Sequence, residues 1–184
     1  MQPQVDQFVV PLFAGASILL LVVAYFTRPT PRRLVAAVAG GLAFGTLNIV
    51  WDVGAYYAGW WYYPWTDAPY APLPFYLIQA LSYGAAVTAL VGWRIIRRFG
   101  TRGLVGFLVL FPIYGAIHDY GGTAAVASSG MLSTTIVFAP GLAALLADAL
   151  CYETMALAAL IVMRLIAGPA NADRLARSPA HQLA

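Results

Sequence analysis

An asparagine and an aspartate stand four residues apart, at Asn48 and Asp52, near the end of an apolar stretch that begins at Leu34. Four residues make about one helical turn, so both side chains would lie on one face of a helix. A carboxylate is costly inside a bilayer unless it faces the protein interior or a wet cavity. We therefore expect Asp52 to belong to a functional site. The alternative is a water-exposed position at the end of the helix.

The composition is that of a membrane protein. Of the 184 residues, 61% are hydrophobic and only 9% are charged, whereas soluble domains carry about a quarter charged residues. The net charge of +3 comes from ten arginines without a lysine, and these arginines fall between the apolar runs. This pattern indicates membrane orientation rather than nucleic-acid binding. We expect an integral protein of a bacterial plasma membrane, with the lipid bilayer as its surroundings and without a nucleic-acid partner.

Five apolar runs approach the length of about 20 residues that a spanning helix needs. The sequence thus predicts an all-α bundle of five transmembrane helices, at roughly residues 8–26, 34–53, 74–93, 103–118 and 138–166. The arginines lie in the first and third connections and at the end of the last run. The positive-inside rule then predicts an external N-terminus and a cytoplasmic C-terminus.

The remaining segments follow from this division. Residues 120–137 are rich in small residues in their first part, so we expect an interfacial or re-entrant segment there rather than a sixth span. Residues 1–168 would form a single transmembrane domain, and residues 169–184 a flexible cytoplasmic tail. The sequence carries no signal for an oligomeric state.

Polar residues on four of the predicted helices share one depth. Counting about 1.5 Å per residue from the nearest arginine places Asp148 and His118 each about 24 Å up. The polar residues near this level are Asn48, Asp52, Gln79, His118 and Asp148. A second layer, near the membrane midplane, holds Tyr83, Tyr114 and Glu153. We infer an apolar pocket that opens toward the outer side and reaches the membrane centre.

Each of these residues also has a structural alternative. Asn48 and Gln79 could simply bond neighbouring helices, and His118 could be a solvated helix cap. Glu153 is five positions beyond Asp148, about 140° around the helix, so the two cannot easily face one pocket. Depth favours Asp148 as the partner of Asp52, and Glu153 remains the alternative acid.

Seven aromatic rings fall within residues 56–65, directly after the second predicted span. They would form either an interfacial aromatic belt or a lid whose ring faces stabilise a cation, and both can hold together. The aromatic residues that we expect to contact a substrate are Trp51, Tyr56, Trp60, Trp61, Tyr83, Tyr114 and Tyr152.

The segment Asn48-Ile49-Val50-Trp51-Asp52 resembles the Asn-x-x-Trp-Glu stretch of the small integral membrane terpene cyclases of fungal meroterpenoid and indole-diterpene pathways, which have bacterial relatives. The resemblance implies that Asp52 is a catalytic acid. It also implies a second carboxylate in the last span, where Asp148 or Glu153 would fit. The motif covers some 15 residues, and the family looks like seven-span proteins, whereas this chain gives five.

Two further resemblances involve the same type of chemistry. The five spans, the paired polar residues on the second span and Tyr114-Gly115 on the fourth resemble the emopamil-binding sterol isomerases. The aromatic stretch between two spans is similar to that of the small carotenoid lycopene cyclases. Their Pro-x-Glu-Glu signature is replaced here by Pro74-Phe75-Tyr76-Leu77. All three families use buried acids to protonate an olefin or an epoxide.

The function expected from the sequence is acid-catalysed cyclisation of an apolar prenyl or terpenoid substrate. Asp52 would donate the proton, and Asp148 would assist it or accept the closing proton. Asn48, Gln79 and His118 would orient these acids. The sequence contains no nucleotide or metal motif, so we expect neither a cofactor nor a metal, although a divalent ion between Asp52, His118, Asp119 and Asp148 stays open. The alternatives are a sterol or carotenoid double-bond isomerase, a lycopene-type cyclase, and a non-catalytic protein that binds an apolar ligand.

Overall fold

The structure is a computed structural model that describes residues 3–129 and 136–170, with side chains for residues 9–122 and 136–170. The tail predicted for residues 169–184 thus lies almost entirely outside the described residues. In chain order the elements are α1 (Pro3–Thr27), α2 (Pro31–Ala58), β1 (Trp61–Tyr62), α3 (Leu73–Gln79), η1 (Ala80–Gly92), α4 (Trp93–Phe99), α5 (Thr101–Ser129), β2 (Val137–Phe138) and α6 (Leu142–Ala167).

The prediction of five membrane spans in an all-α bundle is confirmed. In the described parts of the chain, five helical stretches are long and apolar enough to cross a membrane. One of them, residues 73–99, is built from α3, the π-helix η1 and α4, whose junction residues Ala80 and Trp93 keep helical backbone angles. α3, η1 and α4 therefore act together as one of the five spans.

Two helices extend further than the sequence pattern predicted. Helix α2 continues to Ala58 and α5 to Ser129, beyond the expected ends at residues 53 and 118. Residues 120–129, for which we expected an interfacial or re-entrant segment, thus continue α5, and residues 130–135 lie outside the described part. The apolar pattern of the sequence shows where a helix leaves the hydrocarbon of the membrane. The helix itself can continue into water, because its end is defined by backbone hydrogen bonds.

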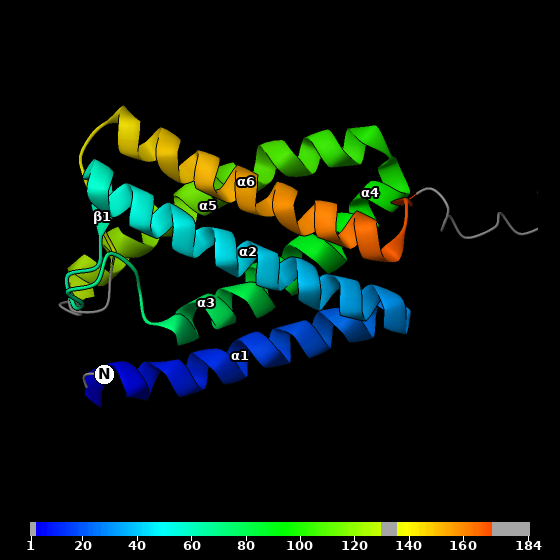
Figure 1. Ribbon diagram of the computed structural model, residues 1–184, viewed down its shortest axis with the longest axis horizontal. Helices are drawn as coiled ribbons and strands as arrows, with labels where there is room; N and C mark the ends of the chain where they lie inside the picture. The colour runs from blue at the N-terminus through cyan, green and yellow to red at the C-terminus, as the bar shows by residue number, and fades with distance from the viewer. Residues whose placement is uncertain (1–2, 130–135, 171–184) are drawn as a thin grey trace, which may run out of the picture.

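Helix α2 lies at the centre of the bundle and packs most extensively on α6 and η1, while α1 lies on the outside (Figure 1). Glycines permit the close approach. A Cβ atom on Gly41 would lie only 2.2 Å from the carbonyl oxygen of Ala80, and one on Gly84 would lie 2.6 Å from Gly41 Cα. Small residues at such crossings let two helix backbones touch, which is how helices associate when lipid is as apolar as their side chains.

This crossing leads to a stability prediction. Gly41→Val should push α2 away from η1 and lower the free energy of unfolding by about 1–3 kcal/mol, as overpacking of a filled interface does. Thermal unfolding in detergent would measure it. The matched control is Gly54→Val on the same helix, where a Cβ atom would meet nothing within 4 Å. Equal shifts of the two variants would contradict the packing account.

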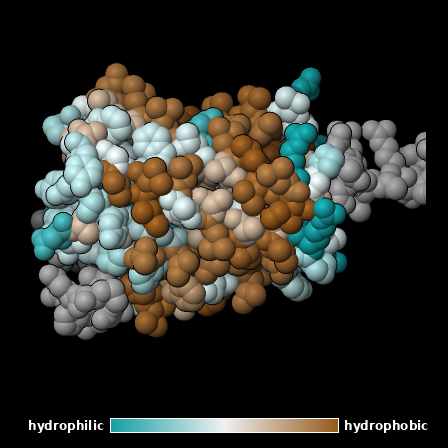
Figure 2. Space-filling model, viewed as in Figure 1, coloured by the Kyte–Doolittle hydropathy of each residue, from teal (hydrophilic) through white to brown (hydrophobic). Residues whose placement is uncertain are grey.

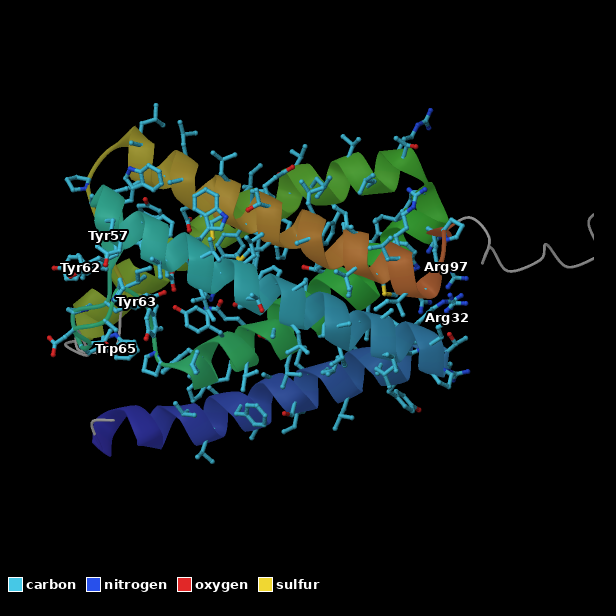
Figure 3. All side chains as sticks on the ribbon, viewed as in Figure 1. Arg32, Tyr57, Tyr62, Tyr63, Trp65 and Arg97 are labelled. Atoms are coloured by element: carbon cyan, nitrogen blue, oxygen red, sulfur yellow. The ribbon has the colours of Figure 1, made fainter. Side chains whose placement is uncertain are left out.

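The two ends of the bundle differ in chemistry. An apolar band covers its middle, with hydrophilic residues at both ends (Figure 2). Arg32 and Arg97 lie at one end, and Tyr57, Tyr62 and Trp65 lie at the opposite end (Figure 3). This is the separation of arginines from aromatic residues that the sequence predicted, and it defines an arginine end and an aromatic end of the molecule.

The orientation of these ends in the membrane can be tested directly. The positive-inside rule predicts that the arginine end faces the cytoplasm. A reporter fused after Ala184 should therefore be cytoplasmic, and one inserted at Asp67, in the connection at the aromatic end, should be external. Reporters on the same side of the membrane would contradict the five-span topology.

Candidate active site

Asp52 of α2 is the centre of a buried hydrogen-bond cluster near the aromatic end. Its side chain is only 3% exposed. Its Oδ1 atom accepts a hydrogen bond from Trp61 Nε1 at 2.9 Å, and its Oδ2 atom accepts from the hydroxyls of Tyr63 at 2.8 Å and Tyr76 at 2.5 Å. Among the described residues, three donors and no acceptor form hydrogen bonds with this carboxyl group, and hydrogen bonds to the charged form offset part of the cost of burying it.

The donors reach Asp52 because the chain folds back over the end of α2. Gly59 adopts a left-handed conformation, with φ of +69°, and ends the helix, a position that favours glycine. The following strand β1 pairs antiparallel with β2, with Trp61 opposite Phe138. Burial and the charge of Asp52 raise the pKa of the Tyr63 hydroxyl well above its ordinary value, so Tyr63 remains a neutral donor at physiological pH.

A second carboxyl group, Asp148 of α6, is also 3% exposed. It lies near enough to Asp119 of α5 for a hydrogen bond between the two side chains, while its Oδ2 atom is buried and makes no hydrogen bond within the described part of the chain. Asp119 also accepts a hydrogen bond from the Tyr152 hydroxyl at 3.0 Å. Two carboxyl groups in such contact cannot both ionise easily, so the pair is suited to holding one proton between them.

His118 connects this carboxyl pair to the outside of the bundle. Its Nδ1 atom lies 2.7 Å from an oxygen of Asp119, and its Nε2 atom lies 3.0 Å from the Tyr83 hydroxyl. The imidazole side chain is 47% exposed, unlike the carboxyl groups of Asp52 and Asp148. The arrangement can therefore pass protons between the surroundings and the buried pair.

An amide pair joins α2 to α3 beside the acids. The Asn48 side-chain amide donates a hydrogen bond to Gln79, and the thiol of Cys151 lies 3.9 Å from the Asn48 oxygen. Both amides line the same cavity as Asp52 and Asp148. The amide pair thus links α2, which carries Asp52, to α3, which carries the Asp52 donor Tyr76.

The shared cavity is small and polar. Its volume is about 40 Å³, which is room for one or two water molecules at about 30 Å³ each. The cavity that the described residues form at this depth is therefore not the large outward-opening apolar pocket that we expected. Trp61 and Tyr63 lie in its wall, because the loop after α2 folds back over Asp52.

Most of the predicted site residues line this cavity together, namely Asn48, Asp52, Trp61, Gln79, Tyr83, Asp148 and Tyr152. His118 adjoins them through its contacts with Asp119 and Tyr83. The four polar residues from α2, α3 and α6 that were predicted to share a depth are thus brought to one place.

Five predicted residues lie elsewhere. Trp51 bonds Thr154 Oγ1 at 2.7 Å across the α2–α6 interface, and Tyr56 is exposed. Trp60 packs against Trp61 rather than lining the cavity. Tyr114 faces an apolar groove, and Glu153 is half-buried and outside the cavity lining. Only Tyr114 and Glu153 of these five were placed by depth, and depth does not determine which face of a helix a residue occupies.

Three residues of the site were missed or undervalued in the sequence. Tyr63 was predicted only as one ring of the aromatic belt or lid, Tyr76 received no role, and Asp119 was considered only as a metal ligand, although Tyr63 and Tyr76 both donate to Asp52. Tyr76 lies three residues before Gln79, which places both on one helical face, so its role could have been predicted. Among the described residues, no group of three or more His, Cys, Asp or Glu side chains could hold a metal ion.

No family model matches this sequence, and the comparisons with curated proteins and with solved structures found no match.

Proposed function

We propose that this protein is an integral membrane cyclase that protonates a terminal double bond or epoxide of a prenyl chain and directs the resulting carbocation into a ring. The observation that carries the proposal is the burial of Asp52 and Asp148, from different helices, in one cavity. Ionisable groups at membrane depth are expensive and usually functional. The one-sided arginines support an orientation with the arginine end at the cytoplasmic face, and we propose a bacterial plasma membrane as its location.

The hydrogen bonds favour a division of roles opposite to the one that the motif implied. Asp148 lies near enough to Asp119 for a hydrogen bond between the two carboxyl groups, so this pair can hold the proton that is donated to the substrate. Asp52 accepts hydrogen bonds on both oxygens and would be the carboxylate. Its negative charge would stabilise the cation and accept the closing proton.

The reaction needs no oxidant and no reductant. One proton moves from Asp148 to a terminal alkene carbon or epoxide oxygen, and the electron pair of a second double bond closes the ring. One proton then leaves the final cation to Asp52, so the product is an isomer of the substrate. Asp52 releases this proton and Asp148 takes one up through Asp119 and His118 before the next turnover. Trp61, Tyr63 and Tyr83 in the cavity wall offer ring faces that stabilise cations.

A turnover assay tests the proposal. Purified protein in nanodiscs would be incubated with farnesyl- and geranylgeranyl-bearing phenols and with their terminal epoxides, without added metal. Mass spectrometry should find cyclic products of unchanged mass. Recovery of every substrate unchanged, together with stoichiometric retention of an apolar ligand, would favour the non-catalytic binding protein instead.

A further inference from the structure

A second and much larger cavity lies on the side of the bundle, between η1, α4 and the first half of α5. This space, the lateral groove, has a volume of about 600 Å³, within the range of sites that enclose small ligands. Its walls are almost wholly apolar and include Phe107 and Phe111. Leu110 and Phe99 in the same wall are more than half exposed, so the groove opens sideways, toward the hydrocarbon of the bilayer.

The two ends of the lateral groove differ in charge. Arg102 is the one charged residue among the described residues that line it. Arg98 adds a second guanidinium group nearby, 5.3 Å from the ring centre of Phe99, which is itself part of the wall. The opposite end is formed by Tyr114, twelve residues and about 18 Å further along α5. A ligand that matches these walls has an anionic head and a long apolar chain.

Pairs of aromatic rings, one ring from each wall, separate the lateral groove from the polar cavity. The ring of Tyr114 lies 6.3 Å from that of Tyr83, and the ring of Phe111 lies 5.7 Å from that of Tyr152. Tyr114 and Phe111 line the groove, while Tyr83 and Tyr152 line the polar cavity. The chain end of a ligand in the groove would therefore lie against the acid site.

We infer that the lateral groove binds a linear isoprenoid chain, with its anionic head at Arg102 and its far end against Tyr114 and Tyr83. Movement of these two rings would admit the far end to Asp148. The identity of the chain as substrate rests on the proposed function. The polar cavity, at about 40 Å³, is too small for such a chain. The groove has the volume and the apolar walls that the chain needs, and Arg102 provides a positive charge for its head.

Photolabelling tests this inference without requiring turnover. The probe is farnesyl phosphate with a diazirine at its far end, and the protein is held in nanodiscs of neutral phosphatidylcholine. Labelling is expected on α5 and η1 near Tyr114 and Tyr83. Gly106→Phe should abolish it, because Gly106 lines the groove and a Cβ atom there would meet nothing within 4 Å. Gly15→Phe, at another open glycine on α1, is the matched control and should label normally.

A charge variant tests the position of the head. Arg102→Gln should weaken binding of the phosphate probe about tenfold, the value of one lost charged hydrogen bond, and should leave labelling by the uncharged farnesol analogue unchanged. Equal loss with both probes would overturn the head placement. Normal labelling of Gly106→Phe would show that the groove is not the binding site of the probe. Complete displacement of the probe by phosphatidylglycerol would show that the groove binds membrane lipid rather than an isoprenoid chain.

The inference and the proposed function can fail separately. Groove labelling that persists in Asp148→Asn, together with wild-type protein that turns over no prenyl substrate, would support the groove and overturn the cyclase. Turnover of a prenyl substrate without groove labelling would support the cyclase and overturn the assignment of the groove.

Discussion

Asp148→Asn should lower turnover of a prenyl substrate at least ~10²-fold, which is the usual contribution of general acid catalysis. The amide keeps the shape of the carboxyl group and can still bond Asp119, but it has no acidic proton to donate. The helices should therefore assemble normally. Initial rates of product formation in nanodiscs would measure the effect, with thermal unfolding as the test of folding.

The chain offers a matched control on the same helix. Glu153 lies five residues from Asp148 and outside the cavity lining, so Glu153→Gln removes a carboxylate of α6 without touching the proposed acid. Its turnover should stay near that of the unmodified protein. Near-normal activity of Asp148→Asn would remove Asp148 from the mechanism, and a large loss in Glu153→Gln alone would transfer the role to Glu153.

Combining Asp52→Asn with Asp148→Asn should cost much less than the product of the two single losses. Each variant alone is expected to lose ~10²-fold or more, because acid and carboxylate act on the same cation. Once either side chain is lost, the other can no longer contribute to the same step. The double variant should therefore turn over about as slowly as the slower of the two single variants. The turnover rates of the unmodified protein, the two single variants and the double variant, measured side by side, give the coupling between Asp52 and Asp148.

The double variant of Asp52→Asn with Glu153→Gln is the control for this coupling. Because Glu153→Gln alone should lose almost no turnover, adding it to Asp52→Asn should leave the rate at that of Asp52→Asn, since the two side chains do not share a cavity. Multiplication of the Asp52 and Asp148 losses would show that the two acids work independently, which contradicts a common site.

Counting residues along the helices groups four of the cavity residues at one level, although Tyr83, predicted for a lower layer, lines the same cavity. Asn48, Asp52, Gln79 and Asp148 were placed at one level by counting residues from arginines, and they line one cavity. Helical rise is nearly constant, and each arginine marks a membrane boundary. Height therefore needs no knowledge of the neighbouring helices.

The face on which a residue lies is much harder to predict here. In a soluble protein the apolar stripe of a helix marks its buried side, but lipid is as apolar as the core of this bundle. Trp51 and Tyr114 could therefore not be distinguished from cavity residues. The 13 π-helical residues of η1 add to the difficulty, because hydrogen bonds to the fifth residue change the rotation per residue.

The donors to Asp52 depend on long-range structure. Tyr63 reaches it through the left-handed turn at Gly59 and the pairing of Trp61 with Phe138, a partner 77 positions away. Seven neighbouring aromatic residues signalled a special loop, but nothing in that stretch specified which ring would turn inward. Tertiary pairing decides that choice.

The central claim is that a buried carboxylic acid of this protein donates a proton to carbon. Incubation of protein equilibrated in D₂O with a prenyl alkene tests it most directly, because the transferred deuteron stays in the product. The account predicts cyclic product with one carbon-bound deuterium per turnover from the unmodified protein and from Glu153→Gln, and almost no product from Asp148→Asn. Cyclic product without deuterium would contradict the account, since the ring would then have closed without proton donation.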